Sequence, residues 1–205
     1  MAGLLDRDKL FVREHVGMFK ARNAYDLLDP ATKEVVGRAE ETVRGPLRKL
    51  LRFTSMKTLL SFTIHFHDAA AGDPSTGGAV VLTVRRPFTW FRSVVTVTDA
   101  AGKVLGRFRQ KLVTIGPKMW ILDASGAEIG MLKGDWIGWN LQVVDNQGRA
   151  LATVTKKWAG IGKELFTSAD NYIIDVADEV TDPDMRRLLF AAPITADMVY
   201  KEYSG

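Results

Sequence analysis

The chain has 205 residues, of which 46% are hydrophobic and 25% charged, and this composition is typical of a globular chain that buries a sizeable core. It contains no cysteine, which excludes structural disulfides, thiolate metal sites, cysteine nucleophiles and palmitoylation. The formal net charge is +4, a smaller excess than nucleic-acid-binding domains carry, so we expect no nucleic-acid partner.

The first third of the chain predicts no targeting segment and one short helix. Residues 1–12 include two acids and no long apolar stretch, so we expect no signal peptide. Residues 44–53 combine leucines with basic residues, which predicts a short helix with one cationic side. Four basic residues recur there at helical spacing: Arg44, Arg48, Lys49 and Arg52.

A hairpin motif repeats along the chain. Three copies, at 97–106, 121–130 and 143–152, place apolar residues on both sides of an Asp-x-x-Gly turn, and a looser copy spans 27–36. The aspartate at the first turn position accepts backbone amides, and the glycine three residues later tolerates positive φ. Apolar residues that alternate with polar ones predict further strands at 62–67, 79–85 and 172–176. Together these signals predict an antiparallel β-meander.

The C-terminal segment predicts a buried helix. Asp182, Pro183 and Asp184 combine a cap, a proline at the first helical position and an acid in the first turn. Residues 188–199 are apolar nearly all round, which is typical of a helix at the centre of a core. Because this stretch is too short to span a bilayer, we expect no transmembrane segment. We predict a mainly β protein in which residues 1–205 form one domain around the C-terminal helix.

Phospholipid scramblases have a signature that this chain resembles over a long, ordered stretch. The signature is a basic–Trp–small–Gly step followed by E-x-F-T-x-A-D-N-aromatic. Here it reads Lys156-Lys157-Trp158-Ala159-Gly160 and then Glu164-Leu165-Phe166-Thr167-Ser168-Ala169-Asp170-Asn171-Tyr172, and Arg86-Pro87 matches another family position. The resemblance covers roughly residues 11–203 and extends to LURP-one-related and tubby-like domains. It implies a closed antiparallel barrel of about twelve strands threaded by the hydrophobic helix.

The same resemblance implies a protein that interacts with phospholipids. Such a protein would either scramble lipids between leaflets or bind anionic headgroups at a membrane surface, and we expect a cytoplasmic location peripheral to the inner face of the plasma membrane. The alternative is a soluble interaction or regulatory scaffold of the LURP-one type with no lipid role. The chain lacks the proline-rich tail and the palmitoylated cysteine cluster of animal scramblases.

Basic residues near aromatic ones are the candidate headgroup contacts. Lys and Arg meet phosphates at a membrane surface, and aromatic rings lie at headgroup level. The candidates are Arg44, Arg48, Lys49, Arg52, Arg85, Arg86, Lys156, Lys157 and Trp158. The alternative for each of the cations is a solvated side chain on a barrel wall, with the aromatic residues in the core or in the strands of the wall.

Neither a cofactor nor a catalytic site is predicted. The calcium loop proposed for the family would fall at 168–179, where Asp170 and Glu179 could supply oxygens. Tyr172 and Ile173 occupy its third-ligand and glycine positions, so we expect a strand there and no calcium site. The sequence contains no G-x-S-x-G, no H-E-x-x-H and no complete phosphate-binding loop. We therefore expect that the chain is not an enzyme.

Overall fold

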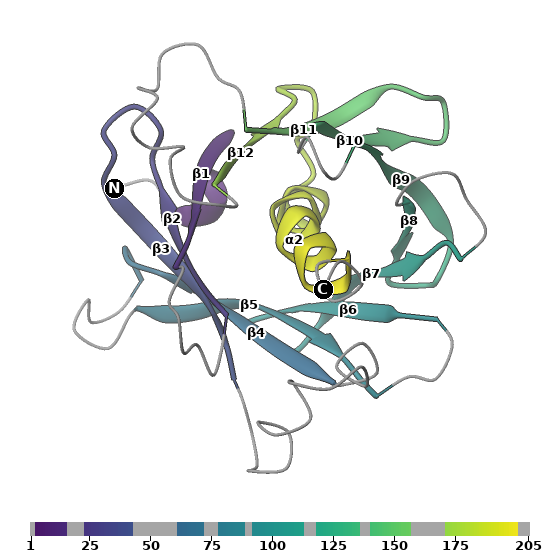
Figure 1. Cartoon of the computed structure of the whole chain (residues 1–205), viewed down its shortest axis with the longest axis horizontal. Coiled ribbons are helices and arrows are strands. Elements are labelled where there is room, and N and C mark those ends of the chain that lie inside the picture. Colours follow the sequence, from purple (N-terminus) through teal and green to yellow (C-terminus); the bar gives the residue numbers. More distant parts are fainter. Residues whose placement is uncertain are drawn as a thin grey trace.

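The computed structural model describes residues 3–15, 23–42, 61–71, 78–88, 92–112, 118–135, 140–156 and 171–200. Its strands form a closed antiparallel barrel around the helix α2 (Pro183–Tyr200) (Figure 1). A short 3-10 helix, η1 (Leu4–Asp6), precedes the first strand. The twelve strands are β1 (Lys9–Glu14), β2 (Ala24–Leu28), β3 (Val35–Glu41), β4 (Phe62–Asp68), β5 (Ala79–Arg86), β6 (Val94–Asp99), β7 (Val104–Gln110), β8 (Lys118–Asp123), β9 (Glu128–Asp135), β10 (Asn140–Asp145), β11 (Ala150–Thr155) and β12 (Tyr172–Val176). Strands that are consecutive in the chain are neighbours, and β1 with β12 closes the ring. The predicted fold class is confirmed, whereas the predicted helix near 44–53 lies outside the described residues.

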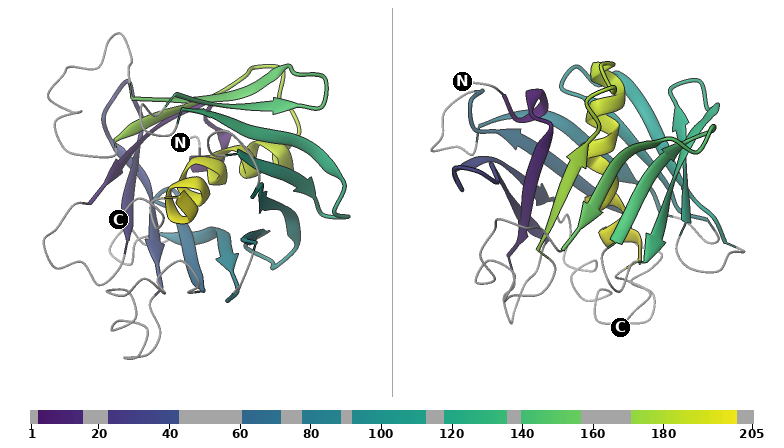
Figure 2. Two further views of the ribbon diagram at one scale, coloured as in Figure 1. Left: turned by 45° about the vertical axis from the view of Figure 1, so that its right-hand side comes forward. Right: turned by 90° about the horizontal axis from the view of Figure 1, so that it is seen from above.

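The barrel has two different rims because every strand runs antiparallel to its neighbours. At one rim, which we call the helix-start rim, β2, β4, β6, β8, β10 and β12 end and α2 begins. At the other, the helix-end rim, β1, β3, β5, β7, β9 and β11 end and α2 reaches Tyr200. The right panel of Figure 2 shows α2 running lengthwise between the strands from one rim to the other.

The predicted turns close the hairpins at the helix-start rim. In three of them the aspartate Oδ1 accepts a backbone amide four residues later at 2.9–3.0 Å. The glycine at the third position after the aspartate has a φ of 82–93°, as the motif requires. These glycines are Gly102, Gly126 and Gly148. In the looser copy the positive φ falls one position later, on Lys33 (63°).

Each hairpin also contains a β-bulge soon after its turn. The pairing register shifts by one residue in all five hairpins joined at this rim. The extra residues are Val36, Val81, Leu105, Ile129 and Leu151, all of which are apolar and belong to the core or pack against it. A bulge reverses the alternation between the two faces of a strand. Val80 is therefore 36% exposed and pairs with His67, although strict alternation predicts that it faces inward with Leu82.

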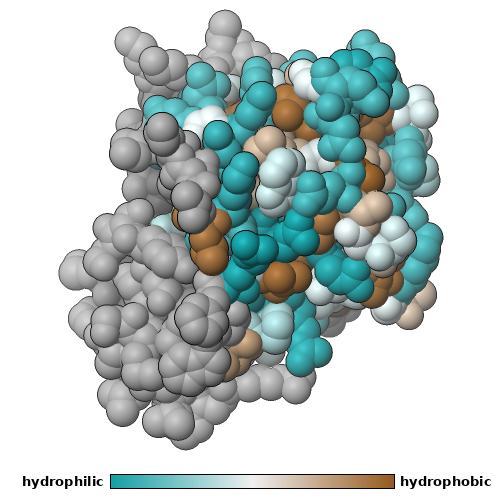
Figure 3. Space-filling view, turned by 90° about the vertical axis from the view of Figure 1, so that its right-hand side faces the viewer, coloured by the Kyte–Doolittle hydropathy of each residue, from teal (hydrophilic) through white to brown (hydrophobic). Residues whose placement is uncertain are grey.

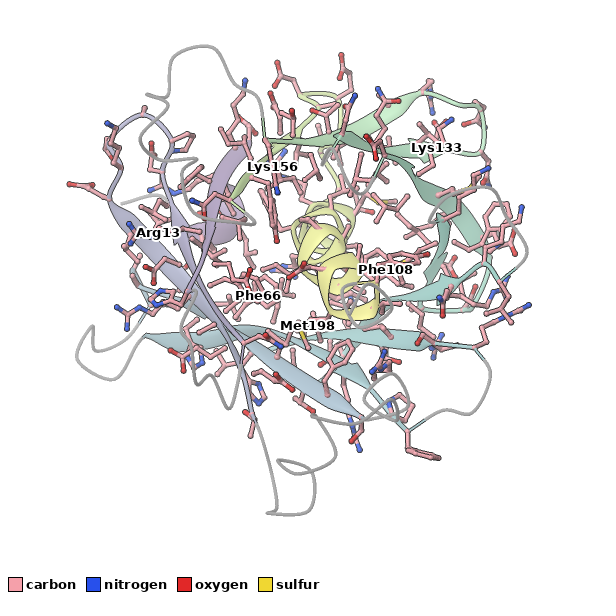
Figure 4. The ribbon with its side chains drawn as sticks, viewed as in Figure 1. Arg13, Phe66, Phe108, Lys133, Lys156 and Met198 are labelled. Atoms are coloured by element: carbon pink, nitrogen blue, oxygen red, sulfur yellow. The ribbon has the colours of Figure 1, made fainter. Side chains whose placement is uncertain are left out.

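Helix α2 fills the barrel, as predicted. Every residue from Leu188 to Val199 is buried. The helix begins at a capped end, where the Asp182 carboxylate accepts the amides of Asp184 (2.8 Å) and Met185 (3.3 Å). Figure 4 shows Phe66 and Phe108 inside the ring of strands, beside α2, and both have an exposed fraction of 1% or less. Among the described residues, no helix is both long enough and apolar enough to cross a bilayer.

Candidate functional site

Basic residues from neighbouring strands line up at the helix-end rim. Lys118 of β8 is paired with Lys133 of β9 in the strand register. Beyond the end of β7, the Lys111 amide donates to the Lys118 carbonyl at 2.9 Å, so Lys111 lies opposite Lys118. The Gln110 amide donates to the Ser93 carbonyl at 2.9 Å, which places Arg92 beside Lys111 by the same antiparallel pairing. These four residues form what we call the cationic row.

The cationic row lies on the outer face of the wall. Its members alternate with inward residues that are buried, namely Ser93, Gln110, Met119 and Leu132. Figure 4 shows Lys133 at the outer side of the ring, and Figure 3 shows hydrophilic and hydrophobic side chains interspersed over this side of the molecule. Arg92 is exposed and the three lysines are partly exposed. Their ammonium groups are therefore accessible to a ligand.

Within the described part of the chain, no carboxylate pairs with Lys111, Lys118 or Lys133. The Lys111 ammonium lies 4.9 Å from the centroid of the Trp120 ring, a contact with a π face and not with an acid. Like charges directly opposite each other on neighbouring strands destabilise a sheet. The row therefore carries an unfavourable repulsion that an anionic ligand would relieve.

Acidic residues gather at the opposite rim. The helix-start rim carries the turn aspartates and a second acidic stretch that leads into α2. These acids are Asp29, Glu34, Asp99, Asp123, Asp145, Asp178, Glu179, Asp182 and Asp184. Two basic residues there pair with these acids: Lys103 reaches Asp184 and Arg149 reaches Asp145, both at 2.6 Å. The protein itself therefore neutralises Lys103 and Arg149, unlike the three lysines of the cationic row, to which the described residues supply no carboxylate.

Arg85 and Arg86, both predicted headgroup contacts, point to opposite faces of the wall. Arg85 is exposed on the outer face of β5. Arg86 has an exposed fraction of 0%, and its guanidinium lies 4.7 Å from the centroid of the Phe62 ring and donates to the Ser93 hydroxyl at 3.3 Å. Successive residues of a strand face opposite sides, so the two arginines form no joint surface. Arg86 belongs to the packed interior of the rim.

Lys156 directly follows β11 and continues the inward-facing series of Ala152 and Val154. Figure 4 shows it at the inner side of the ring, away from the cationic row. The other predicted contacts lie outside the described residues: Arg44, Arg48, Lys49, Arg52, Lys157 and Trp158.

The predicted weak calcium candidates are separated by a strand. Asp170 lies outside the described residues. The strand β12 occupies residues 172–176, in the middle of the 168–179 stretch where the family's calcium loop would fall. Tyr172 and Ile173 are buried, and Glu179 follows at the helix-start rim. The extended backbone of β12 does not wrap around an ion as a calcium loop does. No group of three His, Asp or Glu side chains in the described ranges is arranged to hold a metal.

A buried polar contact fixes the end of α2 against the wall. The Tyr25 hydroxyl donates to the Asp197 carboxylate at 2.6 Å, and both residues are 1% exposed. Burial, followed by the negative charge of Asp197, raises the pKa of Tyr25 well above its ordinary value. Nearby, the Asn23 side chain donates to Glu41 at 2.9 Å, and Glu41 is also buried. These groups face inward and take no part in the outer cationic row.

The sequence alone did not predict the cationic row. Its members are separated by seven to nineteen positions in the chain, and only the strand register makes them neighbours. The signal that could have found it was the Asp-x-x-Gly turn at Asp123 and Gly126. Pairing residues outward from this turn along the two strands brings Lys118 close to Lys133. The two lysines fall directly opposite each other only when Ile129 is counted as an unpaired bulge residue.

Comparison with known proteins places the chain in a family. The sequence profile described as Scramblase matches residues 4–203. A phospholipid scramblase family protein of Schizosaccharomyces pombe is 23% identical over 84% of this chain and 47% of its own length. The Altered inheritance rate of mitochondria protein 25 of Saccharomyces cerevisiae is 19% identical over 96% of this chain and 69% of its own length. The chain thus spans about half the length of the S. pombe relative.

Among solved structures, the X-ray structure of a protein from Arabidopsis thaliana is similar to this chain. The match covers 93% of this chain and 89% of the Arabidopsis chain, with 12% identity and a TM-score of 0.47. The profile match over nearly the whole sequence confirms the resemblance predicted from the 156–172 signature. The chain belongs to the Scramblase family.

Proposed function

We propose that this chain binds anionic phospholipid headgroups at a membrane surface through its helix-end rim. The cationic row supports the proposal most directly, because four basic residues lie side by side there and three of them have no acidic partner within the described residues. Each Lys or Arg near an anionic bilayer contributes about 1 kcal/mol. Four of them would together contribute about 4 kcal/mol, which corresponds to roughly a thousandfold in affinity.

The shape of the row favours a surface over a single small anion. Neighbouring strands lie about 4.8 Å apart, so four positions in register span about 15 Å. The four residues follow the curve of the barrel at its helix-end rim. With this rim on a membrane, phosphates spread over the surface would lie within reach of all four cations, whereas one phosphate would contact one or two of them.

We propose surface binding and not the passage of lipids through the barrel. Helix α2 occupies the interior, where every side chain from Leu188 to Val199 is buried. The proposal assigns no covalent chemistry to the chain. It is consistent with a peripheral position at the inner face of the plasma membrane, because that leaflet is rich in anionic lipid.

Vesicle sedimentation tests this function. The chain is mixed with vesicles of phosphatidylcholine alone or of phosphatidylcholine with phosphatidylserine, in about 0.1 M and about 1 M salt. We expect pelleting with the anionic vesicles at low salt, a large loss at high salt where the Debye length shrinks to about 3 Å, and little binding to neutral vesicles. Absence of pelleting with anionic vesicles would favour the regulatory scaffold.

A further inference from the structure

Two large apolar side chains are half exposed at the rim that carries the cationic row. Phe88 is 50% exposed and Leu112 is 49% exposed. Each lies two residues beyond the end of a strand at the helix-end rim, Phe88 after β5 and Leu112 after β7. Removing apolar surface from water is favourable by about 25 cal/mol for each Å², so burying these two side chains in a ligand would stabilise the complex.

Their positions connect these side chains to the cations. Leu112 directly follows Lys111, and Phe88 lies in the same β5–β6 connection as Arg92. Basic residues beside exposed apolar ones are typical of surfaces that lie in a membrane interface, where cations meet phosphates and apolar side chains enter the acyl boundary. This arrangement fits a bilayer better than it fits a soluble anion, because a soluble anion would leave both apolar side chains in water.

We propose that Phe88 and Leu112 insert into the bilayer and that the barrel docks end-on, with its helix-end rim on the membrane. The proposal deepens the proposed function and rests on it, since the cationic row supplies the electrostatic attraction. Insertion of both side chains fixes the orientation, so that the axis of α2 points toward the bilayer.

The charge of the other rim opposes the reverse orientation. The helix-start rim carries nine acids in the turns and in the approach to α2, and it would face an anionic bilayer unfavourably. That rim also exposes two apolar residues, Val35 (40%) and Val80 (36%). These two valines are controls, because they are also partly exposed and lie at the rim opposite the cationic row.

The absence of cysteine makes site-specific labelling direct. Four single variants, Phe88→Cys, Leu112→Cys, Val35→Cys and Val80→Cys, are each labelled with an environment-sensitive fluorophore and mixed with vesicles containing phosphatidylserine. We expect emission to rise at positions 88 and 112 and to be quenched there by spin-labelled lipid. We expect neither change at positions 35 and 80.

The outcomes separate the two proposals. Variants that pellet with vesicles while the probes at 88 and 112 stay unquenched would overturn insertion and leave headgroup binding standing. Quenching at 35 and 80 instead would reverse the orientation. Failure of the unlabelled chain to pellet would overturn both proposals.

A second measurement needs no probe. Leu112→Ser should weaken binding to anionic vesicles about five- to tenfold, since a partly buried leucine contributes roughly this much. The matched change Val80→Ser should leave binding unchanged. Residual binding of Leu112→Ser should fall more steeply with salt, because only the electrostatic part remains. Equal binding by the two variants, with melting temperatures that stay close to wild type, would contradict insertion.

Discussion

Lys118→Gln should make the protein more stable and at the same time a weaker lipid binder. Lys118 lies between Lys111 and Lys133 in the cationic row and has like charges on both sides. Glutamine keeps much of the length of the side chain and removes the charge. Most substitutions destabilise a protein, so a gain of stability at this position would be a specific sign of relieved repulsion.

The expected magnitude follows from the strand pairing. A cross-strand pair of like charges costs a few tenths of a kcal/mol to about 1 kcal/mol, and Lys118 takes part in two such pairs. We therefore expect the free energy of unfolding to rise by about 0.5–1 kcal/mol in low salt. The gain should vanish in about 1 M salt, where charges several ångströms apart are screened. Loss of one cation should weaken binding to anionic vesicles about fivefold.

Urea unfolding at two salt concentrations measures the first effect, and vesicle sedimentation measures the second. Lys103→Gln is the control, since Lys103 pairs with Asp184 at 2.6 Å and its loss removes an attraction. The control should not gain stability and should bind vesicles as the wild type does. A Lys118→Gln protein that is less stable than wild type at low salt would refute the repulsion argument, and with it the main reason for assigning a ligand to the row.

Three other predictions concern the interior, acid stability and calcium. Leu189→Asp places an unpaired charge at a site with 0% exposure and should cost several kcal/mol; a melting temperature equal to wild type would contradict the central-helix fold. Burial alone would raise the pKa of Asp26, but its contacts with Arg13 (2.7 Å) and His15 (2.9 Å) more than offset burial and lower it. Because the pKa of Asp26 is lower in the folded state than in the unfolded state, its ionised form stabilises the fold at pH values above the unfolded pKa. The free energy of unfolding should therefore decrease as the pH falls below about 4, and urea unfolding at several pH values should show a smaller decrease in Asp26→Asn. Calorimetric titration with calcium near neutral pH should show no binding at micromolar concentrations, and a stoichiometric site abolished by Asp170→Asn would overturn that expectation.

Local signals in the sequence predicted the hairpins and the central helix, whereas the closed barrel was predicted from the family resemblance. The Asp-x-x-Gly turns at Asp99, Asp123 and Asp145 act over a few residues, so their hydrogen bonds follow from residue type alone. The same holds for the capped start of α2 at Asp182 and for its apolar middle. These features were predictable because each of them depends on neighbours in the chain.

The candidate site depends on relations that are not local. Lys111 and Lys133 reach the same row only through pairing with β8, and each hairpin bulge changes the register by one residue. A shift of one residue moves a side chain to the opposite face, as it does at Val80. Arg86 instead continues the inward alternation of Leu82 and Val84, and its burial was missed because its basic side chain indicated contact with headgroups. The sequence predicted which residues are basic near aromatic ones, but not which face of the wall each would occupy.

The most direct test of the central claim compares two double variants of equal net charge. Lys118→Gln with Lys133→Gln removes two cations from the cationic row, and Lys103→Gln with Arg149→Gln removes two from the opposite rim, so each lowers the formal net charge from +4 to +2. Sedimentation with phosphatidylserine vesicles at low salt then separates position from total charge. Our account predicts a loss of binding of about twenty-fivefold for the first variant and wild-type binding for the second. Equal losses in both variants would contradict a lipid-binding site at the helix-end rim.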